Sequence, residues 1–152
     1  MSDSAGRDDP FSGLRAPIKE EEVLCSRNMR ALNEVSGYAK SAVAAIAMPL
    51  HNQASTLYSA LESALSQTLT EGHCAVVLLD DQSTDAWQAE IADLLAHPGL
   101  ILLEGHCGSA ALARNAILDF IESDLPNVRW VARLDPDDLL CSSTSVDALV
   151  CA

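Results

Sequence analysis

Short apolar runs alternating with amphipathic segments constrain the fold of this 152-residue chain more than any other feature. The runs at 43–48, 75–79 and 100–103 are continuously apolar, as in strands that are covered on both faces. A fourth run spans 128–134. The segments between the runs repeat apolar residues at helical spacing (Leu57, Leu61, Leu65; Trp87, Ile91, Leu94, Leu95; Ala113, Ile117, Phe120, Ile121). This order predicts an α/β fold of three α/β/α layers around a mostly parallel sheet.

The first 40 residues differ in character from the rest. Residues 1 to about 17 are polar and interrupted by Pro10, Gly13 and Pro17, which predicts a disordered leader. Three glutamates begin the segment 18–35, whose thin apolar stripe predicts a peripheral, weakly docked helix ended by Gly37. Residues 41–152 are expected to form the folded domain.

Composition and charge exclude several classes of protein. The apolar run 42–50 is too short to cross a bilayer, and the N-terminus lacks a secretory pattern, so we expect no transmembrane segment and a cytoplasmic location. The net charge is −13, and after residue 41 the only basic residues are Arg114, Arg129 and Arg133. Such an acidic surface repels phosphate backbones, which argues against a nucleic-acid partner.

The five cysteines are odd in number and form no C-x-x-C pair, so they do not indicate a disulfide framework. The dipeptides His73-Cys74 and His106-Cys107 could suggest zinc, but adjacent strand residues point to opposite faces. Buried, reduced cysteines are therefore the favoured interpretation.

An acidic cluster, Asp135, Asp137 and Asp138, follows the fourth apolar run. Charged groups are too costly to bury unpaired, so the cluster is expected at the rim of a cleft. Carboxylates grouped this closely suit Mg²⁺ or Mn²⁺ beside a phosphorylated ligand. The alternative is a solvated acidic turn in which Asp135 or Asp138 caps a helix.

Polar residues follow each of the other predicted strands. Because the carboxyl ends of parallel strands share one edge of a sheet, these residues are expected to converge with the acidic cluster on one crevice (His51, Asn52, Asp80, Asp81, Glu104). There Asp80 or Asp81 could accept hydrogen bonds from a nucleobase or a ribose, and His51 could stack on the base. Arg114 could contact a diphosphate or the base. Turn formation, a packed histidine and a solvated helix charge remain the structural alternatives for these residues.

Four segments in order resemble family 2 glycosyltransferases. They are Met48-Pro49-Leu50-His51-Asn52 with the helix after it, residues 77–85, the Gly108 to Ala113-Arg114-Asn115 segment, and Arg133 to Asp138, which is similar to a D-x-D-D metal motif. The resemblance covers residues 41 to about 146. It implies a GT-A fold, a nucleotide-sugar donor (often a UDP-sugar), Mn²⁺ or Mg²⁺, and hexosyl or N-acetylhexosaminyl transfer.

The resemblance also implies roles for individual residues. Asp137, with Asp138 beside it, would bind the metal, and the remaining matched positions would contact the nucleotide sugar (Pro49, His51, Asn52, Asp80, Asp81, Arg114, Asp135). His51 stands where the family commonly has Tyr. No segment matches the acceptor half or the catalytic base, so residues 41–152 are interpreted as the donor-binding half of a transferase, incomplete at its C-terminal side. An incomplete sheet edge would favour self-association.

Two other functions compete with sugar transfer. A non-catalytic nucleotide-sugar-binding module would keep the donor site without the base. A nucleotidyltransferase would need a Gly-rich loop with Arg and Lys after the first strand, and Met48 to Asn52 contains none of these.

Overall fold

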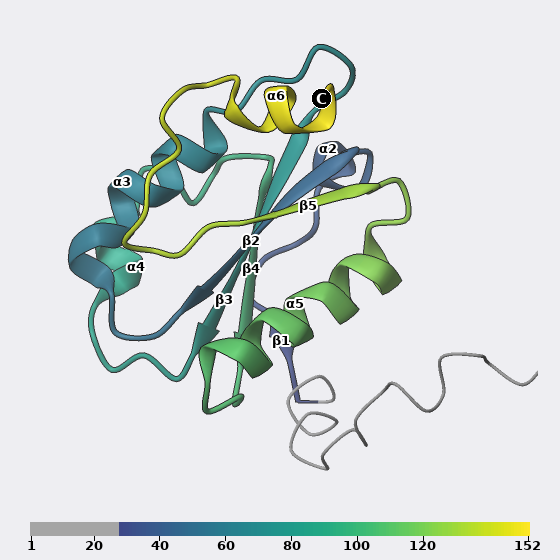
Figure 1. Cartoon of the computed structure of the whole chain (residues 1–152). Helices are drawn as coiled ribbons and strands as arrows, with labels where there is room; N and C mark the ends of the chain where they lie inside the picture. Colours follow the sequence, from purple (N-terminus) through teal and green to yellow (C-terminus); the bar gives the residue numbers. More distant parts are fainter. Residues whose placement is uncertain (1–27) are drawn as a thin grey trace, which may run out of the picture.

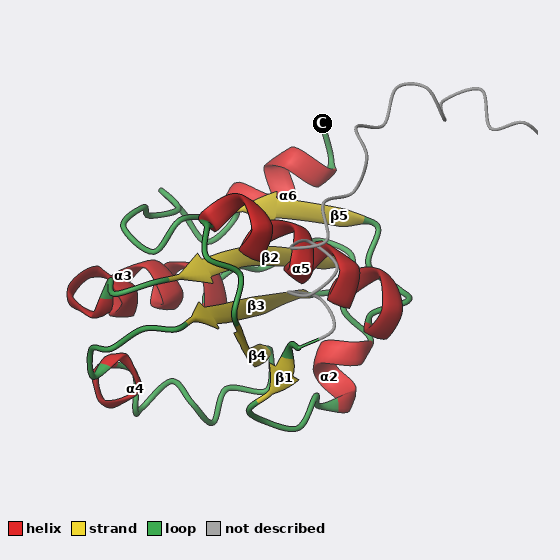
Figure 2. Ribbon diagram, turned by 90° about the horizontal axis from the view of Figure 1, so that it is seen from below, coloured by secondary structure: helices red, strands yellow, loops and turns green. Residues whose placement is uncertain are grey.

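The computed structural model describes residues 28–152, which form a five-stranded sheet with helices on both faces (Figure 1). The strand order is β1-β4-β3-β2-β5, and Figure 2 shows the strands stacked in this order. The strands are β1 (Arg30–Ala31), β2 (Ala44–Leu50), β3 (Cys74–Asp81), β4 (Leu100–Gly105) and β5 (Trp130–Arg133). All neighbouring pairs are parallel except β1 with β4. The predicted mostly parallel α/β architecture is confirmed.

The helices divide between the two faces of the sheet. They are α2 (Gly37–Lys40), α3 (Ala54–Leu65), α4 (Trp87–Glu90), α5 (Ala110–Asp124) and α6 (Ser145–Val150). Side chains of α5 and α2 share one apolar core with Ala45 and Ala47 of β2. Side chains of α3, α4 and α6 share the other core with Ala44 and Ile46. Strands β2 and β3 are buried along their whole length, which explains why their sequences are continuously apolar.

The structure replaces part of the predicted 18–35 helix by a strand. Residues 18–27 of that prediction lie outside the described residues, but Arg30–Ala31 pair antiparallel with β4. The Asn33 side chain then bonds to the backbone of Leu100 and Leu102, at 2.8 and 2.9 Å. The edge of β4 offers unpaired backbone groups, and their pairing outweighs a weak helical stripe. Gly37 begins α2 instead of ending a helix.

Two further elements differ from the sequence prediction. The helix expected around Trp87, Ile91 and Leu94 is only the four-residue α4, and the chain then continues in turns whose amides bond to carbonyls three residues earlier. Helix α3 has no side-chain cap from its own N-cap residue, Gln53, although an Asn, Ser, Thr or Asp is the usual cap. The Asp85 carboxylate accepts the hydrogen bond from the Ala54 amide instead, at 3.0 Å.

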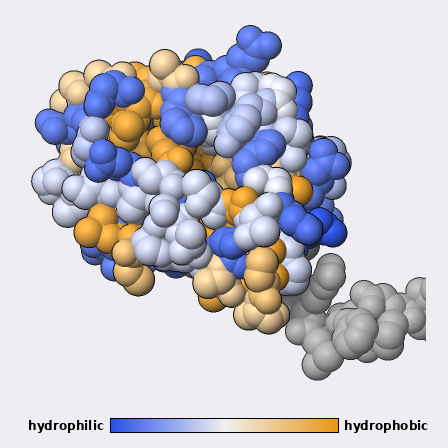
Figure 3. Space-filling view, turned by 90° about the horizontal axis from the view of Figure 1, so that it is seen from above, coloured by the Kyte–Doolittle hydropathy of each residue, from blue (hydrophilic) through white to orange (hydrophobic). Residues whose placement is uncertain are grey.

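Strand β5 is an exposed edge strand, although its apolar sequence predicted burial. It pairs with β2 only, and Trp130 and Val131 are 50% and 40% exposed. Apolar side chains also reach the surface in separate patches on the face seen from above (Figure 3). The cysteines are divided. Cys74 is buried, which raises its pKa to about 12, and Cys107 is buried but disulfide-bonded, whereas Cys141 and Cys151 are exposed free thiols. Among the described cysteines, the prediction of buried, reduced thiols is therefore confirmed for Cys74 and wrong for the other three.

The segment after β5 returns across the sheet face that carries α3. Buried Gln67 fixes it by donating to the Ser142 carbonyl and accepting from the Val146 amide, at 2.7 and 3.0 Å. Two hydrogen bonds from Thr70 to the Asp147 carboxylate hold α6. No helix within residues 28–152 is both long enough and apolar enough to span a bilayer.

Candidate functional site

A cavity of about 420 Å³ opens at the carboxyl edge of the sheet. In Figure 1 the arrowheads of β2 and β3 lie beside the start of α5 at this edge. Four segments line the cavity: the end of β2, the end of β3, the first turn of α5 with the loop before it, and the loop after β5 (Pro49, Leu50, His51, Gln53, Asp81, Gln82, Gly108, Ser109, Ala110, Ala113, Arg114, Asp135, Pro136, Asp137). The parallel topology therefore brings together segments that are distant in the sequence.

Asp80 and Asp81 are the last two residues of β3, and both are buried. The Asp80 carboxylate accepts from the Ser83 amide at 3.0 Å and from the Trp87 indole at 3.2 Å. Asp80 does not line the cavity, and both its oxygens are used to fix the turn after β3. Asp81 does line the cavity, and its carboxylate accepts from the amides of Cys107 and Gly108, at 2.6 and 2.9 Å. It thereby ties the loop before α5 to the end of β3.

His51 follows β2 and is fixed by the neighbouring strand. Its Nδ1 lies 2.7 Å from the Asp81 carbonyl oxygen, which can only accept, so Nδ1 carries a proton. Nε2 lies 3.4 Å from the Asn52 side-chain nitrogen, which fits Nε2 as an acceptor. The imidazole is therefore held as a plane at the cavity wall, as stacking on a base requires.

Asn52 joins the loops that follow β2 and β3. It has a positive φ of 51°, its amide donates to the Ser83 hydroxyl, and its side-chain oxygen accepts from the Thr84 amide at 2.7 Å. Its side chain does not line the cavity. The contacts that the structure gives to Asn52 hold the site together from outside.

The first turn of α5 borders the cavity through Gly108, Ser109 and Ala110. Ser109 caps the helix by accepting from the Leu112 amide at 3.2 Å. Gly108 has a φ of +78°, a conformation that side chains with a Cβ rarely adopt. The amides at this end of a 15-residue helix favour negative charge, such as a diphosphate.

Arg114, in the second turn of α5, supplies the positive charge among the cavity-lining residues. Its Nη2 donates to Asp135 Oδ1 at 2.7 Å, and the two side chains are 26% and 41% exposed. The Arg114 Nε is buried without a hydrogen-bond partner. Residues 135–138 contain no Lys or Arg of their own, and the structure brings one to them from a separate helix.

The acidic cluster combines Asp135, Asp137 and Asp138. Each offers a carboxylate oxygen, and these oxygens lie within 4.8 Å of one another. Asp137 and Asp138 are exposed, whereas the flanking Leu134 and Pro136 are buried and anchor the loop. Three converging carboxylates form a hard oxygen donor set that fits Mn²⁺ or Mg²⁺. Among residues 28–152 it is the only such group of His, Cys, Asp or Glu.

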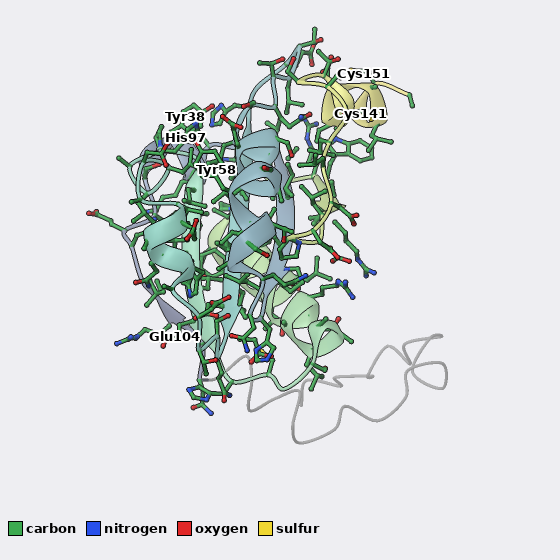
Figure 4. All side chains as sticks on the ribbon, turned by 90° about the vertical axis from the view of Figure 1, so that its left-hand side faces the viewer. Tyr38, Tyr58, His97, Glu104, Cys141 and Cys151 are labelled. Carbon is green, nitrogen blue, oxygen red and sulfur yellow. The ribbon has the colours of Figure 1, made fainter. Side chains whose placement is uncertain are left out.

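Most of the predicted site residues thus meet at one cavity, which Pro49, His51, Asp81, Arg114, Asp135 and Asp137 all line. Asn52, Asp80 and Asp138 lie beside it. Glu104 is directed elsewhere: it pairs with Arg30 at 2.6 Å, at the opposite end of the molecule from Cys141 and Cys151 (Figure 4). Sequence reasoning missed Gln53 and Gln82. Gln82 directly follows the two aspartates and has a positive φ of 58°. Its place in the turn after the predicted strand is the sequence signal that could have identified it as a site residue.

The family model described as Glycosyl transferase family 2 matches residues 45–143. The chain is 34% identical over 95 residues to the Escherichia coli UDP-Glc:alpha-D-GlcNAc-diphosphoundecaprenol beta-1,3-glucosyltransferase WfaP, covering 61% of this chain and 34% of that protein. The structure of S. aureus TarS 1-349 in complex with UDP-GlcNAc matches with a TM-score of 0.58 at 23% identity, covering 70% of this chain and 30% of TarS.

A second solved structure is the mannosyltransferase PcManGT from Pyrobaculum calidifontis in complex with GDP-Man and Mn²⁺. It matches with a TM-score of 0.53 at 17% identity, covering 80% of this chain and 34% of PcManGT. These two likenesses confirm the predicted GT-A type of fold. The chain spans about a third of the length of the relatives it matches.

Proposed function

This chain belongs to glycosyl transferase family 2, and from that membership we propose that it binds the nucleotide-diphosphate-sugar donor of a glycosyl transfer reaction. The proposed donor is a UDP-sugar, and the proposed reaction is metal-assisted hexosyl or N-acetylhexosaminyl transfer to an acceptor. The observation that carries the proposal is the cavity itself. It joins a helix N-terminus, a planar histidine, an arginine and an acidic cluster, which are the groups that a charged nucleotide sugar requires.

Each part of the donor has a proposed binding partner. The His51 ring would stack on the nucleobase, and the Asp81 carboxylate beside it would accept a hydrogen bond from the base or the ribose. Asp80 and Asn52 would stabilise the loops that form this wall of the cavity. Pro49 would close the wall as an apolar contact. The first turn of α5 and Arg114 would bind the diphosphate.

Asp137, with Asp138 and Asp135 beside it, would hold Mn²⁺ or Mg²⁺. When bound, the metal neutralises negative charge that develops on the leaving diphosphate. The protein residues around it would keep the diphosphate oriented, and Asp135 would also reach the nucleotide sugar. A divalent ion in the mannosyltransferase PcManGT supports this assignment by analogy.

The UDP-sugar is proposed because two relatives point to it. WfaP is named as using UDP-Glc, and TarS was solved with UDP-GlcNAc. PcManGT was solved with GDP-Man, so a guanine donor is the direct competitor. Competition between UDP and GDP for the same site distinguishes the two donors.

A non-catalytic nucleotide-sugar-binding module is the second candidate, and one observation favours it. Each carboxylate that lines the cavity within residues 28–152 already has a role. Asp81 binds two backbone amides, Asp135 pairs with Arg114, and Asp137 is assigned to the metal. No described cavity carboxylate is then left to act as a catalytic base.

We also propose self-association through β5, whose outer edge makes no pairing in the described sheet. Trp130 and Val131 present exposed apolar surface there. Sedimentation velocity should show a concentration-dependent oligomer that Val131→Asp dissociates. A monomer at every concentration would contradict this part of the proposal.

The test of donor binding is calorimetric titration with UDP, with and without Mn²⁺, alongside UDP release from UDP-sugars. Asp137→Ala should abolish the metal-dependent part of UDP binding, while Glu122→Ala on the exposed side of α5 should leave it intact. Binding without UDP release would favour the module over the transferase. A folded chain that binds neither UDP nor GDP would refute the donor site.

A further inference from the structure

The ion pair between Arg114 and Asp135 connects two parts of the proposed donor site. Arg114 belongs to the diphosphate end, whereas Asp135 belongs to the acidic cluster. The 2.7 Å contact between Nη2 and Oδ1 is one of two ion pairs in the described residues. A group needed for the diphosphate is therefore already bound to a group of the metal site.

Asp135 has two competing uses. Its Oδ1 accepts from Arg114, yet an oxygen of the same carboxylate lies within 4.8 Å of oxygens of Asp137 and Asp138. A divalent cation held by these three carboxylates would repel the guanidinium and compete with it for Asp135. Arg114 thus stands in the position of an internal counterion to the acidic cluster.

The guanidinium is incompletely used in this pair. Arg114 Nε is buried without a hydrogen-bond partner, and a buried polar group without a partner is unfavourable. A guanidinium carries five N–H donors in a planar fork that matches phosphate oxygens better than a single carboxylate oxygen. A diphosphate in the cavity would offer the missing acceptors.

We propose that Arg114 is the built-in counterion of the metal site, and that a divalent cation at Asp135, Asp137 and Asp138 frees its guanidinium for the donor diphosphate. This inference rests on the proposed donor site and adds how the two ligands of that site influence each other's binding. Metal and nucleotide then bind with positive coupling, and by linkage each raises the affinity for the other by the same factor. The coupling passes through the Arg114–Asp135 pair.

The alternative is that the pair is a static tie between α5 and the loop after β5. A static tie would also be lost on mutation, but it would change fold stability without changing how metal and nucleotide influence each other. Measurements of Mn²⁺ and UDP binding, each made with and without the other, separate the two cases.

The first experiment titrates Mn²⁺ without nucleotide, followed by electron paramagnetic resonance. Arg114→Gln should bind Mn²⁺ about two- to fivefold more tightly than the wild type, the range expected for loss of a partly exposed competing ion pair. The matched control is Arg133→Gln, since Arg133 is exposed, lies two residues before Asp135 and makes no ion pair within residues 28–152. An equal gain in both variants would mean that only net charge matters and would overturn the proposal.

The second experiment approaches the pair from its other partner and stands even if Arg114→Gln does not fold. Asp135→Asn releases Arg114 without metal, so metal-free binding of inorganic pyrophosphate, which lacks the ribose and sugar that Asp135 would contact, should tighten about two- to fivefold. Unchanged or weaker metal-free binding would overturn the proposal. In the Asp135→Asn background, Arg114→Gln should no longer tighten Mn²⁺ binding more than Arg133→Gln does.

The wild type separates the two levels of the proposal. If it binds neither Mn²⁺ nor UDP, the donor site and the counterion both fall. If it binds both, but with a coupling that Arg114→Gln leaves unchanged, the donor site stands and only the counterion falls.

Discussion

Two pairs of aspartates at the same sheet edge are held in opposite ways. Asp80 and Asp81, at the end of β3, are only 8% and 7% exposed, and each carboxylate accepts two hydrogen bonds from the protein. Asp137 and Asp138, after β5, are exposed and have no side-chain partner in the described chain. In the sequence the two pairs look alike, because each pair stands at or just after the end of an apolar strand segment.

The difference separates a scaffold from a binding group. Burying a carboxylate is costly unless its oxygens accept hydrogen bonds, and donors of the protein itself supply these hydrogen bonds to Asp80 and Asp81. Exposed carboxylates keep their lone pairs in water and can exchange water for a cation. The buried pair therefore shapes the cavity wall, and the exposed cluster is the part left open to a metal.

The largest effect expected from this comparison is on stability. Asp80→Ala leaves the Ser83 amide and the buried Trp87 indole without their acceptor. Because these hydrogen bonds involve a charged group, we expect the free energy of unfolding to fall by about 2–4 kcal/mol. Urea denaturation followed by tryptophan fluorescence measures it.

Asp138→Ala is the control from the exposed cluster, and its free energy of unfolding should change by less than about 0.5 kcal/mol. Equal losses in the two variants would break the distinction between scaffold and binding group.

A smaller effect is expected at the loop that satisfies Asp81. Gly108 donates to that carboxylate from a φ of +78°, and a Cβ added to it would meet no atom within 4 Å. Gly108→Ala should therefore lower the free energy of unfolding by about 1–2 kcal/mol through backbone strain, without a steric clash. Thermal or urea unfolding checks this value.

Gly37→Ala is the matched control. Gly37 also has open space around it but lies at the start of α2 without a positive φ. Its replacement should be neutral or slightly stabilising. If the two variants lose the same stability, the strained loop is not what holds Asp81 in place.

Much of this organisation could be predicted from the sequence. Parallel strands place their carboxyl ends on one edge, so the convergence of His51, Asp81 and Asp137 followed from three apolar runs and their order. The division between buried and exposed aspartates could not be predicted. It depends on β3 extending through Asp81, where the neighbouring strands and loop cover it.

The remaining errors have the same physical origin, because tertiary pairing decided them. Arg114 and Asp135 are 21 residues apart on different elements, and no local pattern joins them. Strand β1 exists because β4 has a free edge, and β5 is exposed because it pairs on one side only. Local propensity predicted the regular elements but not what lies across from them.

The smallest predicted effect concerns Asp147, which combines features of both aspartate pairs. It is a carboxylate on α6 that accepts from the Thr70 amide and hydroxyl, at 2.8 and 2.7 Å. The backbone hydrogen bond from Thr70 is the main cause that lowers the pKa of Asp147 below 3.8, and the Thr70 hydroxyl adds to it. A carboxyl whose pKa is lower in the folded state stabilises the fold above the unfolded value. That stabilisation is lost as the pH falls through the folded pKa.

Asp147→Asn should therefore lower Tm most above about pH 4, and the difference from the wild type should shrink as the pH falls below that value. Differential scanning calorimetry across this range measures it. Thr70→Val is the control, since it removes the hydroxyl that donates to Asp147 but keeps the backbone donor, and it should show a smaller loss of Tm with the same dependence on pH. A Tm difference for Asp147→Asn that stays constant with pH would show that the charge of the Asp147 carboxylate does not contribute to holding α6. Accepting hydrogen bonds from the protein would then not be enough to distinguish a structural carboxylate from one that is open to a cation.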